Sequence, residues 1–124
     1  MSAGAQAPLV VLAAGGTGGH LFPAEALSHA LHRAGARVAL ITDTRAAEYA
    51  GNFPAESIHA VPAATPSGKS PVAMAKAALV LLKGGLAARQ AIKQLRPAIV
   101  VGFGGYPTVP PVFAAALMGV PTLL

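Results

Sequence analysis

Two glycine-rich segments hold the residues of this sequence that are best suited to chemistry. Residues 15–20 read GGTGGH, and residues 102–106 read GFGGY. Glycine lets the backbone approach a ligand closely, and the N–H groups at the start of a following helix attract phosphate. The first segment adds the hydroxyl of Thr17 and the imidazole of His20, both of which can form hydrogen bonds to a ligand. Both segments are therefore candidates for binding phosphate groups.

The first segment also fits part of a dinucleotide-binding fingerprint. Gly16 and Gly18 occupy the first two glycine positions of G-x-G-x-x-G, but Leu21 stands at the third. Asp43, at the end of the next expected strand, would then bind the ribose of a nicotinamide cofactor. The same sequence also fits a tight turn that requires small residues and binds no ligand. The nicotinamide interpretation therefore stands as an alternative.

The second segment favours a different ligand. It continues through Thr108 to Pro110 and follows another expected strand. Two strand-to-helix glycine loops at one edge of a parallel sheet can face a single cleft, and ligands bind at that edge in such folds. Together the loops can hold a diphosphate and position a sugar, whereas a dinucleotide oxidoreductase needs only the first.

The elements that must position these loops alternate between apolar runs and helical patterns. We expect strands over residues 9–13, 37–42, 57–61, 98–101 and 120–124, and helices over 23–34, 44–51, 72–95 and 111–118. The third helix should break or bend at Gly84 and Gly85, because glycine weakens a helix. This alternation predicts an α/β fold, a Rossmann-like open parallel sheet in a single domain of 124 residues.

Positive charge gathers in the second part of the chain. All four acidic residues lie within the first 56 positions, and only basic residues follow, which indicates an anionic partner. On the helix expected over residues 72–95, Lys76 and Lys83 share a face next to Leu79 and Val80. These four residues suit contact with an anionic membrane surface. Burial of the same apolar residues in the core is an equally good interpretation.

Composition excludes several classes of protein. There is no cysteine, so disulfides, thiolate metal sites and a cysteine nucleophile are excluded, and no carboxylate cluster joins the histidines in a metal site. Aromatic residues make up only 5% of the chain, too few for the stacking platforms of a nucleic-acid binder. We expect no membrane-spanning segment, because no uninterrupted apolar stretch approaches the roughly 20 residues needed.

The two loops and their spacing resemble those of the MurG-like family of glycosyltransferases. Residues 15–23, GGTGGHLFP, are similar to the family's first glycine loop, and residues 102–110 are similar to its second. The intervening loop at Gly68 and Lys69 and the basic helix are also similar, so the resemblance covers nearly the whole chain. Val109 departs from the family, which often has glycine there, and removes flexibility from the second loop.

The resemblance implies a GT-B enzyme whose N-terminal, acceptor-binding half is residues 1–124. The family transfers N-acetylglucosamine from UDP-N-acetylglucosamine to undecaprenyl-diphosphoryl-N-acetylmuramyl-pentapeptide, a peptidoglycan precursor, with inversion and without a metal or other cofactor. Its members work as peripheral proteins at the cytoplasmic face of the cell membrane and take no nucleic acid as partner. We expect the donor-binding C-terminal domain to lie beyond residue 124, and the chain alone to be inactive.

The family's functional positions fall on defined residues of this sequence. His20 and Tyr106 match positions tied to activity, and we expect His20 to deprotonate or orient the acceptor hydroxyl. The resemblance also implies a set that reaches the donor and a set that binds the acceptor diphosphate. The donor set is Thr17, Gly18 and Gly19, and the diphosphate set is Gly102, Gly104, Gly105 and Thr108.

A non-catalytic function is a further alternative. A half-protein of this fold can bind a lipid-linked diphosphate and recruit a separate donor-binding subunit. Split relatives of this kind usually carry a membrane-spanning N terminus, and the start of this sequence does not look like one.

Overall fold

The strands of this protein form one parallel sheet. The computed structural model describes residues 7–15, 18–48, 50–63 and 68–124. The strands are β1 (Leu9–Ala13), β2 (Arg37–Asp43), β3 (Ser57–Val61), β4 (Ile99–Gly102) and β5 (Thr122–Leu123). They lie in the order β3-β2-β1-β4-β5, and every pair is parallel. The predicted α/β fold with a Rossmann-like open sheet is confirmed.

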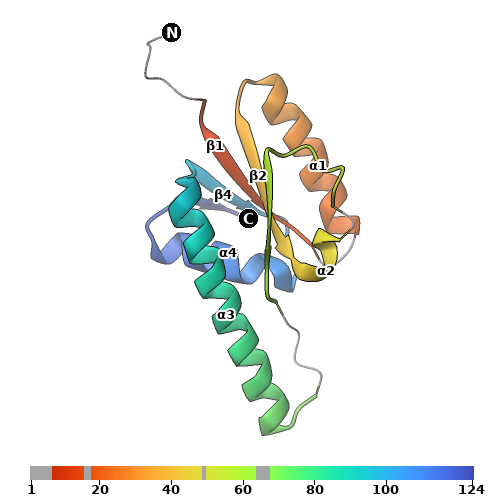
Figure 1. The fold of residues 1–124 in the computed structure, drawn as a ribbon, viewed down its shortest axis with the longest axis vertical. Helices are drawn as coiled ribbons and strands as arrows, with labels where there is room; N and C mark the ends of the chain where they lie inside the picture. The colour runs from red at the N-terminus through yellow and green to blue at the C-terminus, as the bar shows by residue number, and fades with distance from the viewer. Residues whose placement is uncertain (1–6, 16–17, 49, 64–67) are drawn as a thin grey trace.

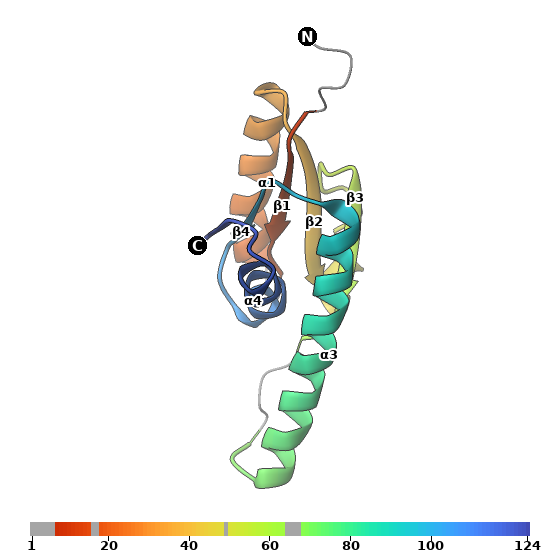
Figure 2. The ribbon, with the colours of Figure 1, turned by 90° about the vertical axis from the view of Figure 1, so that its left-hand side faces the viewer.

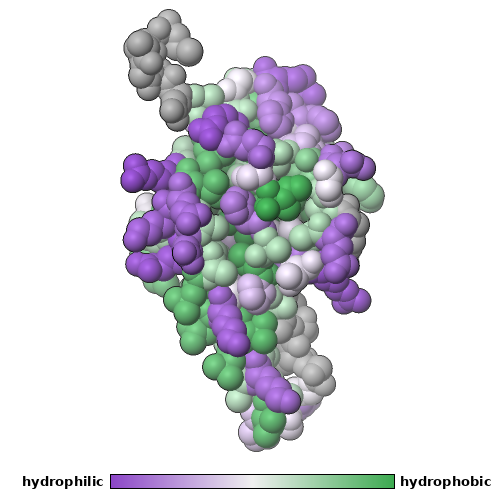
Figure 3. Space-filling model, viewed as in Figure 1, coloured by the Kyte–Doolittle hydropathy of each residue, from purple (hydrophilic) through white to green (hydrophobic). Residues whose placement is uncertain are grey.

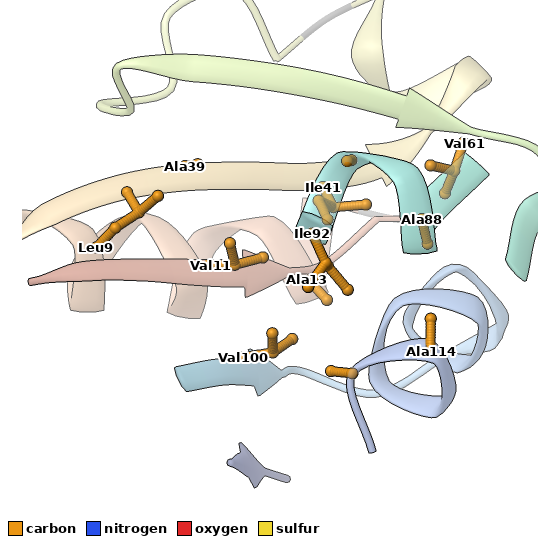
Figure 4. Close-up of a cluster of buried hydrophobic side chains, with 12 residues drawn as sticks. Leu9, Val11, Ala13, Ala39, Ile41, Val61, Ala88, Ile92, Val100 and Ala114 are labelled. Carbon is orange, nitrogen blue, oxygen red and sulfur yellow. The ribbon is translucent and has the colours of Figure 1, made fainter. Parts of the chain in front are cut away.

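Helices cover both faces of the sheet (Figures 1 and 2). They are α1 (Gly18–Arg33), α2 (Thr44–Ala47), α3 (Pro71–Leu95) and α4 (Val109–Leu117), and the 3-10 turn η1 (Tyr106–Thr108) precedes α4. One apolar cluster joins α1 and α2 to one face of the sheet, and a second joins α3 and α4 to the other. Figure 4 shows the second cluster, in which side chains of α3 (Ala88, Ile92) and α4 (Ala114) gather with those of the strands, such as Val11 and Val100.

The position of β1 in the middle of the sheet explains why its sequence is apolar without interruption. Successive side chains of a strand point to opposite faces. Val11 and Ala13 therefore pack beneath α3 and α4, while Val10 and Leu12 pack beneath α1. A parallel strand with helices on both faces has no polar side, and all five residues of β1 are buried.

Three helix boundaries differ by more than one residue from those predicted. The end of α2 was predicted at Gly51 but lies at Ala47. The start of α1 was predicted at Pro23, but the helix begins at Gly18, within the first glycine loop. Proline is favoured near helix starts, yet Pro23 removes only the N–H that would reach the carbonyl of Gly19, so the helix tolerates it. The last helix begins at Val109, directly after η1, rather than at Pro111.

The predicted break in α3 is wrong. The helix runs without interruption through Gly84 and Gly85, from its N-cap Ser70 to its last residue, Leu95. Gly84 is buried, and a Cβ atom placed on it would lie 2.0 Å from the carbonyl oxygen of Pro62. The missing side chain therefore serves packing between α3 and the segment after β3.

The first half of α3 extends beyond the sheet. Figures 1 and 2 show this half projecting past the carboxyl ends of the strands, while the second half packs on the sheet. By length and composition alone α3 is long and apolar enough to cross a membrane, which the sequence did not lead us to expect. Its second half is instead fixed to the domain through Ala88, Ala91 and Ile92.

We predict opposite effects for alanine at the two glycines of α3. Gly84→Ala should lower the free energy of unfolding by about 1–3 kcal/mol, because its Cβ overlaps the Pro62 carbonyl. Gly85→Ala meets nothing within 4 Å and should raise stability by up to about 1 kcal/mol, since alanine favours the helix. Urea unfolding followed by circular dichroism measures both. Equal effects of the two substitutions would contradict the packing role of Gly84.

Candidate functional site: two glycine loops at one sheet edge

Both glycine loops leave the sheet at the point where the strand order reverses. The chain passes from β1 outward through β2 and β3, then returns to place β4 on the other side of β1. Ala13, at the end of β1, lies opposite Gly102, at the end of β4. A crevice forms at such a switch point, outside the carboxyl ends of the strands, and it is where open α/β sheets bind ligands. The structure thus brings together the two segments predicted to form the site.

His20 connects the two loops. Its Nδ1 atom lies 3.1 Å from the carbonyl oxygen of Gly15, at the start of the first loop. Its ring packs against the second loop, where a Cβ on Gly105 would lie 3.1 Å from Cε1 and one on Gly104 would lie 3.9 Å from Nε2. Because a carbonyl only accepts, Nδ1 is the donor, and Nε2 is then the basic nitrogen of the neutral ring.

Gly104 and Gly105 are exposed and adopt a backbone that other residues avoid. Their φ angles are 93° and 81°, in the left-handed region, where a side chain is strained. At Gly105 a side chain would also press against the ring of His20. Glycine at these two positions therefore serves both the turn and the close approach of the two loops.

Gly102 and Thr108 lie beneath the second loop rather than on its surface. The Thr108 side chain is buried, and its hydroxyl donates to the carbonyl oxygen of Gly104 at 2.7 Å. The hydroxyl oxygen of Thr108 also lies 3.3 Å from the carbonyl oxygen of Ala13. A Cβ on Gly102 would lie 2.5 Å from the methyl group of Thr108. The predicted diphosphate set thus has an exposed pair, Gly104 and Gly105, and a buried pair that supports it.

The remaining predicted residues of the first loop stand at the start of α1. Gly18 and Gly19 are its first two residues, and its first turn carries no acidic side chain. The N–H groups of that turn have no helical partner and, with the helix dipole, favour an anion. Thr17 and the side chain of Tyr106 lie outside the described residues, although the backbone of Tyr106 begins η1.

Asp43 does not have the environment of a ribose-binding residue. It is buried, and its Oδ2 accepts a hydrogen bond of 3.2 Å from the N–H of Ala46, which caps α2. Its Oδ1 lies 2.4 Å from where a Cβ on Gly15 would stand. Asp43 therefore supports the base of the first loop, and this environment weighs against the nicotinamide alternative.

Sequence reasoning missed Thr42, the residue before Asp43. Its hydroxyl oxygen is fully buried, forms no hydrogen bond within the described part of the chain, and lies 2.5 Å from the Cβ position of Gly15. The only signal in the sequence was a polar residue near the end of an apolar strand. Thr42 and Asp43 together explain why the first loop begins with glycine, since any side chain at residue 15 would collide with both.

Two charged groups of the described residues with a shifted pKa, Arg37 and Glu56, lie at the amino ends of the strands, away from the glycine loops. Arg37, at the start of β2, donates two hydrogen bonds to Glu56, just before β3. These bonds hold the pKa of the Glu56 carboxyl below its usual value and raise that of Arg37. Among the described residues, no group of three histidines or acids could hold a metal ion.

The predicted membrane-contact residues lie on the projecting half of α3. Lys76 and Lys83 are exposed, Leu79 is 58% exposed, and Val80 is half-buried. Burial in the core is therefore wrong for Leu79. Three further apolar residues with exposed side chains extend this face, namely Val72, Leu82 and Leu86. Figure 3 shows apolar surface interrupted by hydrophilic residues on this part of the molecule.

Comparison with known proteins gives a consistent result. Residues 10–124 match the model of the glycosyltransferase family 28 N-terminal domain. The chain is 60% identical over 116 residues to the UDP-N-acetylglucosamine--N-acetylmuramyl-(pentapeptide) pyrophosphoryl-undecaprenol N-acetylglucosamine transferase of Allorhizobium ampelinum, covering 94% of this chain and 31% of that protein. It is 59% identical over 117 residues to the protein of the same name from Methylobacterium sp. strain 4-46, covering 94% and 32%. The chain thus spans about a third of the length of these curated relatives.

Solved structures agree with this similarity. The fold matches the crystal structure of Acinetobacter baumannii MurG with a TM-score of 0.74 and 29% identity, over 93% of this chain and 32% of that one. It also matches CalG4, the calicheamicin glycosyltransferase, with a TM-score of 0.61 and 22% identity, over 95% of this chain and 32% of that one. The second match shows the fold alone.

Proposed function

The chain belongs to the glycosyltransferase family 28 N-terminal domains, and from this we propose that it is the acceptor-binding half of an N-acetylglucosaminyltransferase. The proposed reaction moves N-acetylglucosamine from UDP-N-acetylglucosamine to undecaprenyl-diphosphoryl-N-acetylmuramyl-pentapeptide, as the names of the relatives indicate for those proteins. The chain spans about a third of their length. We therefore expect turnover only when a donor-binding domain completes the cleft.

The observation that carries this proposal is the meeting of both glycine loops at His20. Gly104 and Gly105 expose their backbone next to the start of α1, at the switch point of the sheet. In the proposal, their N–H groups bind the acceptor diphosphate, and Gly102 and Thr108 hold the loop in place from below. Thr17, Gly18 and Gly19 reach the donor from the first loop.

His20 is the proposed proton acceptor. With Nδ1 donating to the Gly15 carbonyl, Nε2 takes the proton of the acceptor hydroxyl. The hydroxyl oxygen then attacks the anomeric carbon of N-acetylglucosamine with inversion, and the bond to UDP breaks, leaving its electron pair on the diphosphate. Backbone N–H groups and the dipole of α1 stabilise the phosphate charge, so the proposal requires no metal or other cofactor. We also assign Tyr106 to this catalytic region.

The projecting half of α3 is proposed to bind the membrane surface. It extends from the same edge of the sheet as the glycine loops (Figure 2). Exposed Leu79 and Leu82 would enter the interface, and Lys76 and Lys83 would contact anionic lipid head groups. This arrangement suits a peripheral protein at the cytoplasmic face, where a lipid-linked acceptor presents its diphosphate.

Binding of the acceptor tests the proposed site directly. Titration with a soluble analogue of the lipid-linked muramyl-pentapeptide diphosphate should show saturable binding. Gly104→Val should weaken it by about tenfold or more, because a side chain strains the loop and covers its N–H groups. Gly119→Val is the matched control, since Gly119 also has a positive φ and open surroundings but follows α4 away from the loops. Equal weakening of analogue binding by both variants would show that the second loop is not part of the binding site.

The role of His20 is tested by turnover. In the chain joined to a donor-binding domain, His20→Ala should lower kcat by about 10²–10⁴-fold, because general-base catalysis contributes that much. Normal turnover of the variant would show that His20 is not the base.

The membrane contact is tested with vesicles of phosphatidylglycerol and phosphatidylcholine. The pair Lys76→Glu and Lys83→Glu should greatly reduce co-sedimentation, since attraction to the anionic surface becomes repulsion. Arg89→Glu and Lys93→Glu make the same charge change in the half of α3 that packs on the sheet. If the two double variants bind equally, net charge rather than the projecting surface governs binding.

A further inference from the structure

The start of α4 holds the second glycine loop in place. Thr108 is the N-cap residue of this helix, but its hydroxyl makes no capping bond and donates instead to the carbonyl oxygen of Gly104 at 2.7 Å. Gly104 belongs to the exposed tip of the loop that is proposed to bind the acceptor diphosphate. The position of this tip therefore depends on the position of the first turn of α4.

One side of this turn packs directly on the end of β4. A Cβ atom placed on Gly102 would lie 2.5 Å from the methyl group of Thr108 and 2.9 Å from a methyl group of Val112. Real Cβ atoms do not come so close to other atoms, so the two methyl groups fill the space that the glycine leaves. The first turn of α4 consequently has no room to move toward β4.

The other side of the turn meets a second glycine, in α3. Gly84 and Pro110 are both buried, and a Cβ atom placed on Gly84 would lie 3.2 Å from Cγ of Pro110, the second residue of α4. The same Cβ would lie 2.0 Å from the carbonyl oxygen of Pro62. The backbone of α3 thus approaches the ring of Pro110 with no side chain of Gly84 between them.

A displacement of Pro110 must pass to its own backbone. Most side chains can relieve crowding by changing rotamer, but the proline ring is bonded to the backbone nitrogen and fixes φ. Pro110 also lies only two residues after Thr108. A group that presses on the ring therefore shifts the first turn of α4, and Thr108 carries this shift to the carbonyl of Gly104.

We propose that Gly84 is a positioning residue for the second glycine loop. This inference rests on the proposed function. Because Gly84 has no side chain, α3 can hold Pro110 from one side while Gly102 receives the other side of the same turn. The start of α4 is then fixed between two glycines, which keeps the N–H groups at the tip of the loop in place for the diphosphate. Gly84 acts through Pro110 and not through contact with the ligand.

Binding of the soluble analogue of the lipid-linked acceptor tests this role. Gly84→Ala should weaken binding about fivefold, because α3 must move relative to the start of α4 to make room for the methyl group. Gly85→Ala adds the same group where nothing lies within 4 Å, and it should leave the affinity unchanged. Ile92→Val lowers stability by removing a buried methyl group of α3 without crowding Pro110, and it should also leave the affinity unchanged.

Pro110→Ala tests the same contact from the side of α4. It removes the ring that Gly84 meets and places a good helix former there, so it should weaken analogue binding about threefold. When Gly84→Ala and Pro110→Ala are combined, the loss should be smaller than the product of the two single losses, because both substitutions act on one contact. Circular dichroism checks folding, and Pro110→Ala alone decides if Gly84→Ala does not fold. An unchanged affinity in Pro110→Ala, or independent losses in the double variant, would overturn the proposal.

The outcomes separate this inference from the proposed function. If the unaltered chain and Gly84→Ala bind the analogue equally well, only the positioning role is overturned. Equal weakening by Gly84→Ala and Ile92→Val would show that Gly84 acts through stability alone, which overturns the same role. If the unaltered chain does not bind the analogue, the proposed function is wrong, and the positioning role with it.

Discussion

The pairing of β1 with β4 is the constraint on which the candidate site depends. It places Ala13 opposite Gly102, so that two loops from distant parts of the sequence start from neighbouring strands. Thr108 then ties the second loop back to this pair through the carbonyl oxygens of Gly104 and Ala13. The ring of His20 contacts both loops, at the carbonyl of Gly15 in the first and beside Gly105 in the second. Without this pairing, neither loop would have a partner to complete a crevice.

Glycine has two different tasks in this arrangement. At Gly104 and Gly105 it allows positive φ angles at the exposed tip of a loop. At Gly15, Gly84 and Gly102 it makes room for neighbouring atoms that would lie within 2.0–2.5 Å of a Cβ. The second group allows the neighbouring elements to pack closely together.

The sequence predicted those parts of the fold that local pattern determines. Strands such as β1 are buried on both faces, which leaves a continuous apolar run that can be recognised without a structure. The continuity of α3 through Gly84 could not be predicted, because the reason is a contact with Pro62. Asp43 and Thr108 were also ambiguous. Their side chains bond to backbone groups three and four residues away, at Ala46 and Gly104, and the sequence alone does not distinguish such a local bond from a contact with a ligand. Sequence reasoning thus identified the two loops that the fold brings together, but not the layer that supports them.

The two halves of α3 link the proposed membrane surface to the site. The second half is packed on the sheet, so the projecting half is held in a fixed direction relative to the glycine loops. Burying one exposed leucine in an apolar environment gains about 1.5–3 kcal/mol, whereas one basic residue at an anionic surface gains about 1 kcal/mol. With Leu79, Leu82 and Leu86 exposed on this helix, apolar contact should outweigh charge. Salt should therefore weaken the membrane contact without abolishing it, and the lysines chiefly select anionic lipid.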